Sequence, residues 1–148
     1  SVIGYAFYAE RGKAVMKKTN EVSKLAGVSR RTLQYYDDEG ILVVKRSQNN
    51  HRLYDEKSLN KIWQIMIYKE MGFELKEIKQ LFEIPNSEKK NLLRLRLKTV
   101  EDEIEKLKEQ IEFISLVLVH GMPQIPDEHG GMTYVKYIEE LRKQLELT

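Results

Sequence analysis

Eight apolar residues in the second half of the chain are spaced alternately four and three positions apart. This spacing is the a/d pattern of a coiled coil, and it runs unbroken for more than three heptads between Ser87 and Val119. A helix of about thirty residues is roughly 45 Å long, so its apolar seam needs a partner helix along its length. The seam consists of Leu93, Leu97, Val100, Ile104, Leu107, Ile111, Ile114 and Leu118.

The simplest source of a partner helix is a second copy of the chain, which predicts a homodimer. The alternative is a long helix that folds back onto its own domain. Charged residues make up 32% of the 148 residues, which fits a long solvated helix, and the hydrophobic content of 41% allows a separate compact core.

A pair of short helices joined by a tight turn is predicted near the start of the chain. Asn20 is suited to cap a first helix, Glu21–Ala26, and Gly27 to end it. Ser29 is a good N-cap for a second helix that ends at Gly40. On that helix Leu33 packs inward together with Tyr36 and the preceding Val28. The opposite face carries Arg30, Arg31, Gln34 and Tyr35, side chains that suit a DNA major groove.

The next segment predicts a two-stranded wing. Two β-prone runs, 43–46 and 51–54, flank the turn-forming stretch 47–50, where Asn tolerates the positive φ of a hairpin turn. Leu53 and Tyr54 are the expected anchors, because an isolated hairpin is marginally stable. Lys45, Arg46 and Arg52 are then available for phosphates. Between residues 17 and 52 there are eight Lys/Arg and four Asp/Glu, the charge footprint expected of a nucleic-acid contact.

Three further helices complete the predicted organisation. Asp55 caps a helix that reaches Met71, and Phe73 starts a short one that ends before Pro85. Thr133–Leu147 is the last. Their apolar stripes, assigned to packing, are Leu59, Ile62, Trp63, Met66 and Ile67, then Leu75, Ile78, Leu81 and Phe82, then Tyr134, Ile138, Leu141 and Leu145. The predicted parts are an extension before Met16 (1–15), native or added for expression, a DNA-binding domain (16–84), a dimerisation helix (87–119) and a loop with a short helix (120–148).

Several classes of function are excluded or disfavoured. The chain has no cysteine, hence no disulfide, thiolate metal site or cysteine nucleophile. The longest apolar run, 114–119, is too short to cross a membrane, so a cytoplasmic location is expected. The three histidines form no nucleophile–base pattern and no Gly-rich phosphate loop is present, so an enzyme is not expected.

Three motifs in order resemble the MerR family of transcriptional regulators. They are the stretch from Asn20 to Asp37 followed by Gly40-Ile41-Leu42, then 50–55 (NHRLYD), then 71–78 (MGFELKEI). The resemblance covers about residues 19–82, and the heptad helix follows where the family places its dimerisation helix. Four positions depart from the family pattern: Gln34 stands for a frequent Arg, Thr19 for an apolar residue, Val44 for a common Pro, and Asn50-His51 for Gly-Tyr.

The resemblance implies a mainly α protein: a winged helix-turn-helix followed by an antiparallel coiled coil and a short C-terminal helix. It implies a homodimer that binds a pseudo-palindromic operator in a promoter spacer and distorts the DNA, acting on RNA polymerase indirectly. It places Arg52 at a wing arginine that meets phosphate and Tyr36 at an aromatic that packs the helix pair. The candidate DNA-binding residues are Ser29, Arg30, Arg31, Thr32, Gln34, Tyr35, Lys45, Arg46 and Arg52.

No cofactor is predicted, and the effector is not identified by the sequence. The cysteine-based metal sensing of some family members is excluded, because this chain has no cysteine. His120, Asp127, Glu128 and His129 are a weak candidate set for a divalent metal, and a solvated polar loop is the preferred interpretation. Ordinary packing is likewise preferred over a small pocket between Tyr134, Tyr137 and the long helix.

Two other hypotheses remain open at the level of sequence. An architectural or phage directionality-type factor shares the winged unit, but the long heptad helix disfavours it. The other is a coiled-coil adaptor without DNA function, which would show no salt-dependent affinity for DNA. The operator, the target genes and the direction of regulation are not specified by these patterns.

Overall fold

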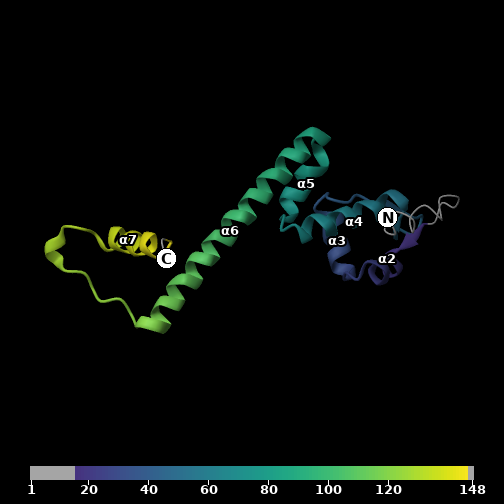
Figure 1. Ribbon diagram of the computed structural model, residues 1–148. Helices are drawn as coiled ribbons and strands as arrows, with labels where there is room; N and C mark the ends of the chain where they lie inside the picture. The colour runs from purple at the N-terminus through teal and green to yellow at the C-terminus, as the bar shows by residue number, and fades with distance from the viewer. Residues whose placement is uncertain (1–15, 147–148) are drawn as a thin grey trace, which may run out of the picture. The chain divides into compact units, whose positions relative to one another are not determined.

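The computed structural model describes residues 16–146, and the predictions for residues 1–15 and for Leu147 lie outside them. The described residues divide into two compact units, 16–89 and 90–146. Elements in the first unit are β1 (Lys17–Lys18), α2 (Thr19–Ala26), α3 (Arg30–Asp38), β2 (Lys45–Arg46), β3 (Arg52–Tyr54), α4 (Glu56–Glu70) and α5 (Leu75–Glu83). Helix α6 (Asn86–His120), the short 3-10 turn η1 (Glu128–Gly130) and α7 (Tyr134–Glu146) follow (Figure 1).

The wing is the predicted hairpin with one strand added. Strand β3 lies in the middle of a three-stranded antiparallel sheet of order β1-β3-β2. Lys17 of β1 pairs with Tyr54, and Arg46 of β2 pairs with Arg52. Strand β1 was not predicted, because two residues are too few to show an alternating pattern.

The helix-turn-helix begins two residues earlier than predicted. Asn20 is not the cap of α2, since Lys18 holds the N-cap position and its backbone N–H donates to the Glu21 carboxylate at 3.2 Å. Gly27 ends the helix with φ of 73°, as predicted. The Ser29 hydroxyl accepts a hydrogen bond from the Thr32 N–H at 3.0 Å, which confirms Ser29 as the N-cap of α3.

A single core holds the first unit together, with the recognition helix and the wing both anchored in it. Burial raises the pKa of the Tyr36 and Tyr54 phenols, so both remain neutral at physiological pH. Tyr54 confirms the predicted anchor of the wing. The buried apolar residues are Val22, Leu33, Tyr36, Ile41, Leu42, Val44, Tyr54, Ile62, Ile65, Phe73, Ile78 and Leu81.

The apolar stripe of α4 is rotated relative to the prediction. Trp63 is 46% exposed and Ile67 39% exposed, so assigning both to the core was wrong. Ile62 of the predicted stripe is buried as expected, and Ile65, which the stripe omitted, is fully buried. The apolar arc of α4 is wider than the surface that its neighbours cover, and the spacing alone does not say which edge of the arc faces inward.

Asp55 caps α4 as predicted. One of its carboxylate oxygens accepts hydrogen bonds from the Ser58 N–H at 2.8 Å and the Ser58 hydroxyl at 2.9 Å. These bonds, the backbone one foremost, hold the pKa of Asp55 below its ordinary value of 3.8. A carboxyl whose pKa is lower in the folded state stabilises the fold above its unfolded pKa, and this contribution is lost as the pH falls through the folded pKa.

We expect Asp55→Ala to lower the free energy of unfolding by about 1 kcal/mol near neutral pH. Urea denaturation of the wild type and the variant checks this. The difference between their free energies of unfolding should shrink in acid, at pH values below the lowered pKa of Asp55. A difference that is the same at neutral and acidic pH would contradict the assignment of the cap to an ionised carboxylate.

Helix α6 is one unbroken helix of 35 residues (Figure 1), which corresponds to roughly 52 Å. Its ends lie within one residue of the predicted 87–119. Leu93 and Val100 of the seam are half-buried. The other six seam residues are exposed, namely Leu97, Ile104, Leu107, Ile111, Ile114 and Leu118.

Helix α7 lies within the predicted 133–147. The Thr133 hydroxyl accepts a hydrogen bond from the Lys136 N–H at 3.1 Å and so caps the helix. On the predicted shared face, Leu141 and Leu145 are half-buried, whereas Tyr134 and Ile138 are exposed. None of the helices within residues 16–146 combines the length and the apolar character that crossing a membrane requires.

Candidate nucleic-acid interface

The recognition helix α3 has two distinct faces. Leu33 and Tyr36 are buried in the core, with exposed fractions of 0% and 1%. The opposite face is open to solvent and carries the predicted DNA-contacting side chains. These are Arg30, Arg31, Gln34 and Tyr35, all exposed in this structure. The helix therefore presents two cations, one amide and one phenol on a single face.

Two of the nine predicted residues have a structural role at the start of α3. The Ser29 and Thr32 hydroxyls lie 2.9 Å apart and hydrogen-bond to each other. Ser29 also caps the helix, so its hydroxyl is occupied by the protein. The Thr32 side chain is half-buried next to it.

The turn of the wing depends on Asn50. This residue has φ of 62°, the only positive φ of a non-glycine residue within 16–146. Its N–H donates to the Ser47 carbonyl at 2.9 Å, and the Ser47 N–H donates to the His51 carbonyl at 2.8 Å. Asn takes the left-handed conformation more readily than most residues, so it replaces the glycine usual in the family and keeps the turn.

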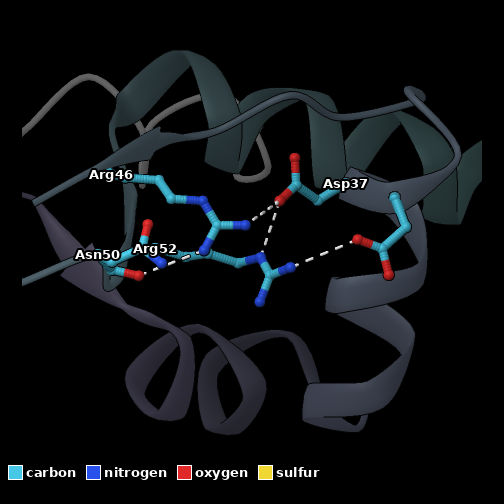
Figure 2. Close-up of polar contacts among 5 residues, drawn as sticks. Asp37, Arg46, Asn50 and Arg52 are labelled. Atoms are coloured by element: carbon cyan, nitrogen blue, oxygen red, sulfur yellow. Dashed lines mark hydrogen bonds and ion pairs between the residues drawn. The ribbon is translucent and has the colours of Figure 1, made fainter.

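The wing arginines are bonded to the recognition helix. Arg52 Nε donates to Asp37 Oδ2 at 2.8 Å, and Arg46 Nη2 lies 3.5 Å from the same oxygen (Figure 2). Arg52 Nη2 also reaches Asp38 Oδ1 at 3.5 Å. Arg46 remains 40% exposed, whereas the Arg52 side chain is only 16% exposed. Lys45, on β2, is exposed.

A surface hollow of about 480 Å³ lies beside α3. Arg31, Gln34 and Tyr35 of α3 line it, together with Lys69 of α4 and Leu75 of α5. Lys69 adds a cation from another helix next to the DNA-facing side chains. Lys69 is not among the predicted DNA-binding residues, because its place in the hollow depends on the tertiary arrangement of α3 and α4.

Asp37 was also absent from the predicted site. The sequence feature that could have indicated Asp37 is the acidic end of α3, where no basic residue lies in the last turn. A helix C-terminus carries negative partial charge, so carboxylates there favour cations supplied by another segment.

The candidate metal ligands are not brought together. His120 ends α6, and Asp127, Glu128 and His129 lie in or next to η1. His129 Nε2 is 4.0 Å from Asp127 Oδ1, and the His129 side chain is 93% exposed. Across residues 16–146, no three His, Asp or Glu side chains are close enough to hold a metal ion.

Comparison with known proteins gives matches along most of the chain. The family profile described as MerR HTH family regulatory protein matches residues 17–83. The profile described as MerR, DNA binding, matches residues 59–116. The transcriptional activator TipA of Streptomyces coelicolor is 32% identical over 132 residues, which are 84% of this chain and 52% of TipA. The chain spans about half the length of the curated relatives it matches.

Many solved structures are similar, and two of them bear directly on the family. One is MtaN, the N-terminal part of the Bacillus subtilis multidrug transporter activator, with 31% identity and a TM-score of 0.65 over 69% of this chain and 97% of that one. The other is HiNmlR, described as a MerR family regulator lacking the sensor domain and bound to promoter DNA. It has 27% identity and a TM-score of 0.52 over 71% of this chain and 89% of that one. These matches confirm the predicted winged helix-turn-helix and the family resemblance: the chain belongs to the MerR family of regulatory proteins.

Proposed function

We propose that the protein is a cytoplasmic transcriptional regulator that binds, as a homodimer, a pseudo-palindromic operator in a promoter spacer and distorts the DNA. The observation that carries this proposal is the exposed face of α3, where Arg30, Arg31, Gln34 and Tyr35 stand opposite the buried Leu33. Arg guanidinium and Gln amide groups can each form paired hydrogen bonds with base edges in the major groove. DNA binding itself is proposed to need no cofactor.

The homodimer is supported by the exposed seam of α6. Soluble monomers rarely leave a long row of large apolar side chains open to water. Leu97, Ile111 and Ile114 are each about 60% exposed, and the seam repeats with heptad spacing along most of the helix. A second copy supplies a helix with the same spacing, and one recognition helix of each copy then reads one half-site.

DNA distortion is inferred from the resemblance to the family. Bending or untwisting a promoter spacer costs on the order of 1–6 kcal/mol, which additional protein–DNA contacts must offset. Arg30, Arg31, Lys45 and Lys69 are available for such contacts, and RNA polymerase would respond to the changed DNA geometry. HiNmlR was solved on promoter DNA, which supports promoter binding here.

Gel-shift titration of a duplex selected by the wild-type protein from a random pool tests the proposal. We expect Arg30→Ala and Arg31→Ala each to weaken binding by about 1–3 kcal/mol if the two residues contact bases. Lys98→Ala is a matched control, because Lys98 is an exposed cation of α6 that lies outside the seam.

Three outcomes separate the hypotheses. Equal affinities for all three variants would contradict the assignment of α3 as the recognition helix. An absence of any salt-dependent DNA affinity in the wild type would favour a coiled-coil adaptor instead. Specific binding that distorts the DNA without any change in promoter activity would favour an architectural factor.

A further inference from the structure

The acidic end of α3 is the place where the recognition helix meets the wing. The unpaired carbonyl groups of a helix C-terminus carry negative partial charge, and carboxylates there add unfavourable charge. Helix α3 ends with Asp37 and Asp38 and has no basic residue in its last turn. The compensating cations come from the wing, as Arg46 on β2 and Arg52 on β3.

We propose that Asp37 is a positioning residue, which fixes the orientation of the wing relative to the recognition helix and on which DNA binding therefore depends. This inference rests on the proposed DNA-binding function and deepens it. Figure 2 shows one oxygen of the Asp37 carboxylate joined to the guanidinium groups of both Arg46 and Arg52. The side chains of Asp37 and Arg52 are only 12% and 16% exposed, so water and salt screen their 2.8 Å bond weakly.

One carboxylate connects both strands of the wing to one helix. Arg46 and Arg52 are direct partners in the register of β2 and β3. Arg46 Nη1 also donates to the carbonyl of Asn50, the turn residue, at 3.2 Å. A hairpin this short is marginal alone, so its tilt depends on what it is bonded to. Buried Tyr54 anchors its base, and the Asp37 bonds fix the side that faces α3.

The same contacts give Arg52 a different role from the one implied by the family resemblance. Its Nε is bonded to Asp37, and its Nη2 lies 3.5 Å from Asp38. These donors are directed at protein carboxylates and hold the strand in place. Lys45 is exposed, and Arg46, although bonded to Asp37 and Asn50, is 40% exposed, so these two wing cations are more accessible to phosphates than Arg52.

A positioning role and a simple charge effect predict opposite results when Asp37 is neutralised. If only charge matters, removing a carboxylate beside a phosphate-binding surface strengthens DNA binding. If wing orientation matters, the same substitution weakens it, because both arginines lose their common partner and the phosphate contacts lose their alignment.

The test compares Asp37→Asn with Glu39→Gln on a duplex that the wild-type protein recovers from a random pool. Glu39 is the exposed C-cap residue of α3, and its side chain forms no hydrogen bond or ion pair with residues 16–146. We expect Asp37→Asn to weaken binding about tenfold, the equivalent of one charge-assisted hydrogen bond. Glu39→Gln should bind as tightly as the wild type or slightly more tightly. The dependence of log K on log salt should become shallower in Asp37→Asn only, because fewer phosphates are engaged.

A second measurement does not require DNA. Hydrogen exchange of the β2 and β3 amides should become faster in Asp37→Asn and stay unchanged in Glu39→Gln, while the thermal unfolding of both variants shows that the domain is folded. Equal DNA affinities in the two variants together with unchanged wing exchange would overturn the proposal. If the wild type has no DNA affinity, the proposed function fails separately, and the exchange data still decide whether Asp37 holds the wing.

Discussion

Ile104→Asp is expected to convert the proposed dimer into monomers and to abolish binding to the selected operator. Ile104 lies near the middle of the seam, whose spacing of 4, 3, 4, 3, 4, 3, 4 reads the same from both ends. In the proposed antiparallel pair, with the two seams centred on each other, each seam residue would meet another and Ile104 of one copy would face Leu107 of the second copy. The substitution places two unpaired carboxylates in the centre of this interface.

The expected size of the effect follows from the cost of burying those charges. Even at roughly 2 kcal/mol for each buried, unpaired group, the two sites together raise the dimer dissociation constant about a thousandfold. Sedimentation equilibrium measures this change directly. A monomer carries one recognition helix and reaches one half-site, so specific DNA affinity should fall when dimerisation is lost.

Leu95→Asp is the matched control for Ile104→Asp. Leu95 lies on the same helix, is apolar and is 63% exposed, but it does not belong to the seam. Leu has a slightly higher helix propensity than Ile, so Leu95→Asp costs the helix at least as much, and a larger loss of dimer in Ile104→Asp reports the interface. If Leu95→Asp dissociated the protein and Ile104→Asp did not, the seam would be assigned to the wrong face of α6.

Leu33→Ala should have the second largest effect, on the free energy of unfolding. Leu33 is fully buried on the inner face of α3, and replacing a buried Leu by Ala costs about 2–5 kcal/mol. Small domains are stable by only about 5–15 kcal/mol in total, so this substitution would remove a large fraction of the free energy of unfolding of the DNA-binding unit. Urea denaturation followed by circular dichroism measures the shift.

Leu25→Ala provides the comparison for Leu33→Ala. Leu25 is on α2 and is 66% exposed, so its truncation should change the free energy of unfolding by less than about 0.5 kcal/mol. Comparable losses in both variants would mean that the core does not depend on the inner face of α3. Operator affinity should fall in Leu33→Ala only to the extent that the domain is unfolded.

The local features of the fold could be predicted from the sequence because each depends on a few neighbouring residues. Ser29 and Asp55 cap their helices, Gly27 ends α2, and Asn50 takes a positive φ, all through interactions within four positions of the chain. The predicted dimerisation helix, 87–119, matches the limits of α6 to within one residue at each end.

Features that depend on tertiary packing were missed. The pairing of Asp37 with Arg52 spans fifteen positions, and no local spacing indicates it. The exposure of Trp63 and the burial of Ile65 reflect how α4 is rotated against its neighbours, and residue spacing on one helix defines only a broad apolar arc. The shared hollow beside Arg31 and Lys69 likewise requires knowledge of how α3 and α4 pack.

The central place of β3 in its sheet has a practical consequence for protein engineering. The two lysines of β1 hydrogen-bond to β3 from the side opposite β2, so the two residues before α2 are part of the wing. A truncation that removes Lys17 and Lys18 would expose one edge of β3 and leave a two-stranded ribbon next to the recognition helix. Trimmed versions of the DNA-binding unit should therefore keep β1, and a tag joined directly to Thr19 would replace a structural strand.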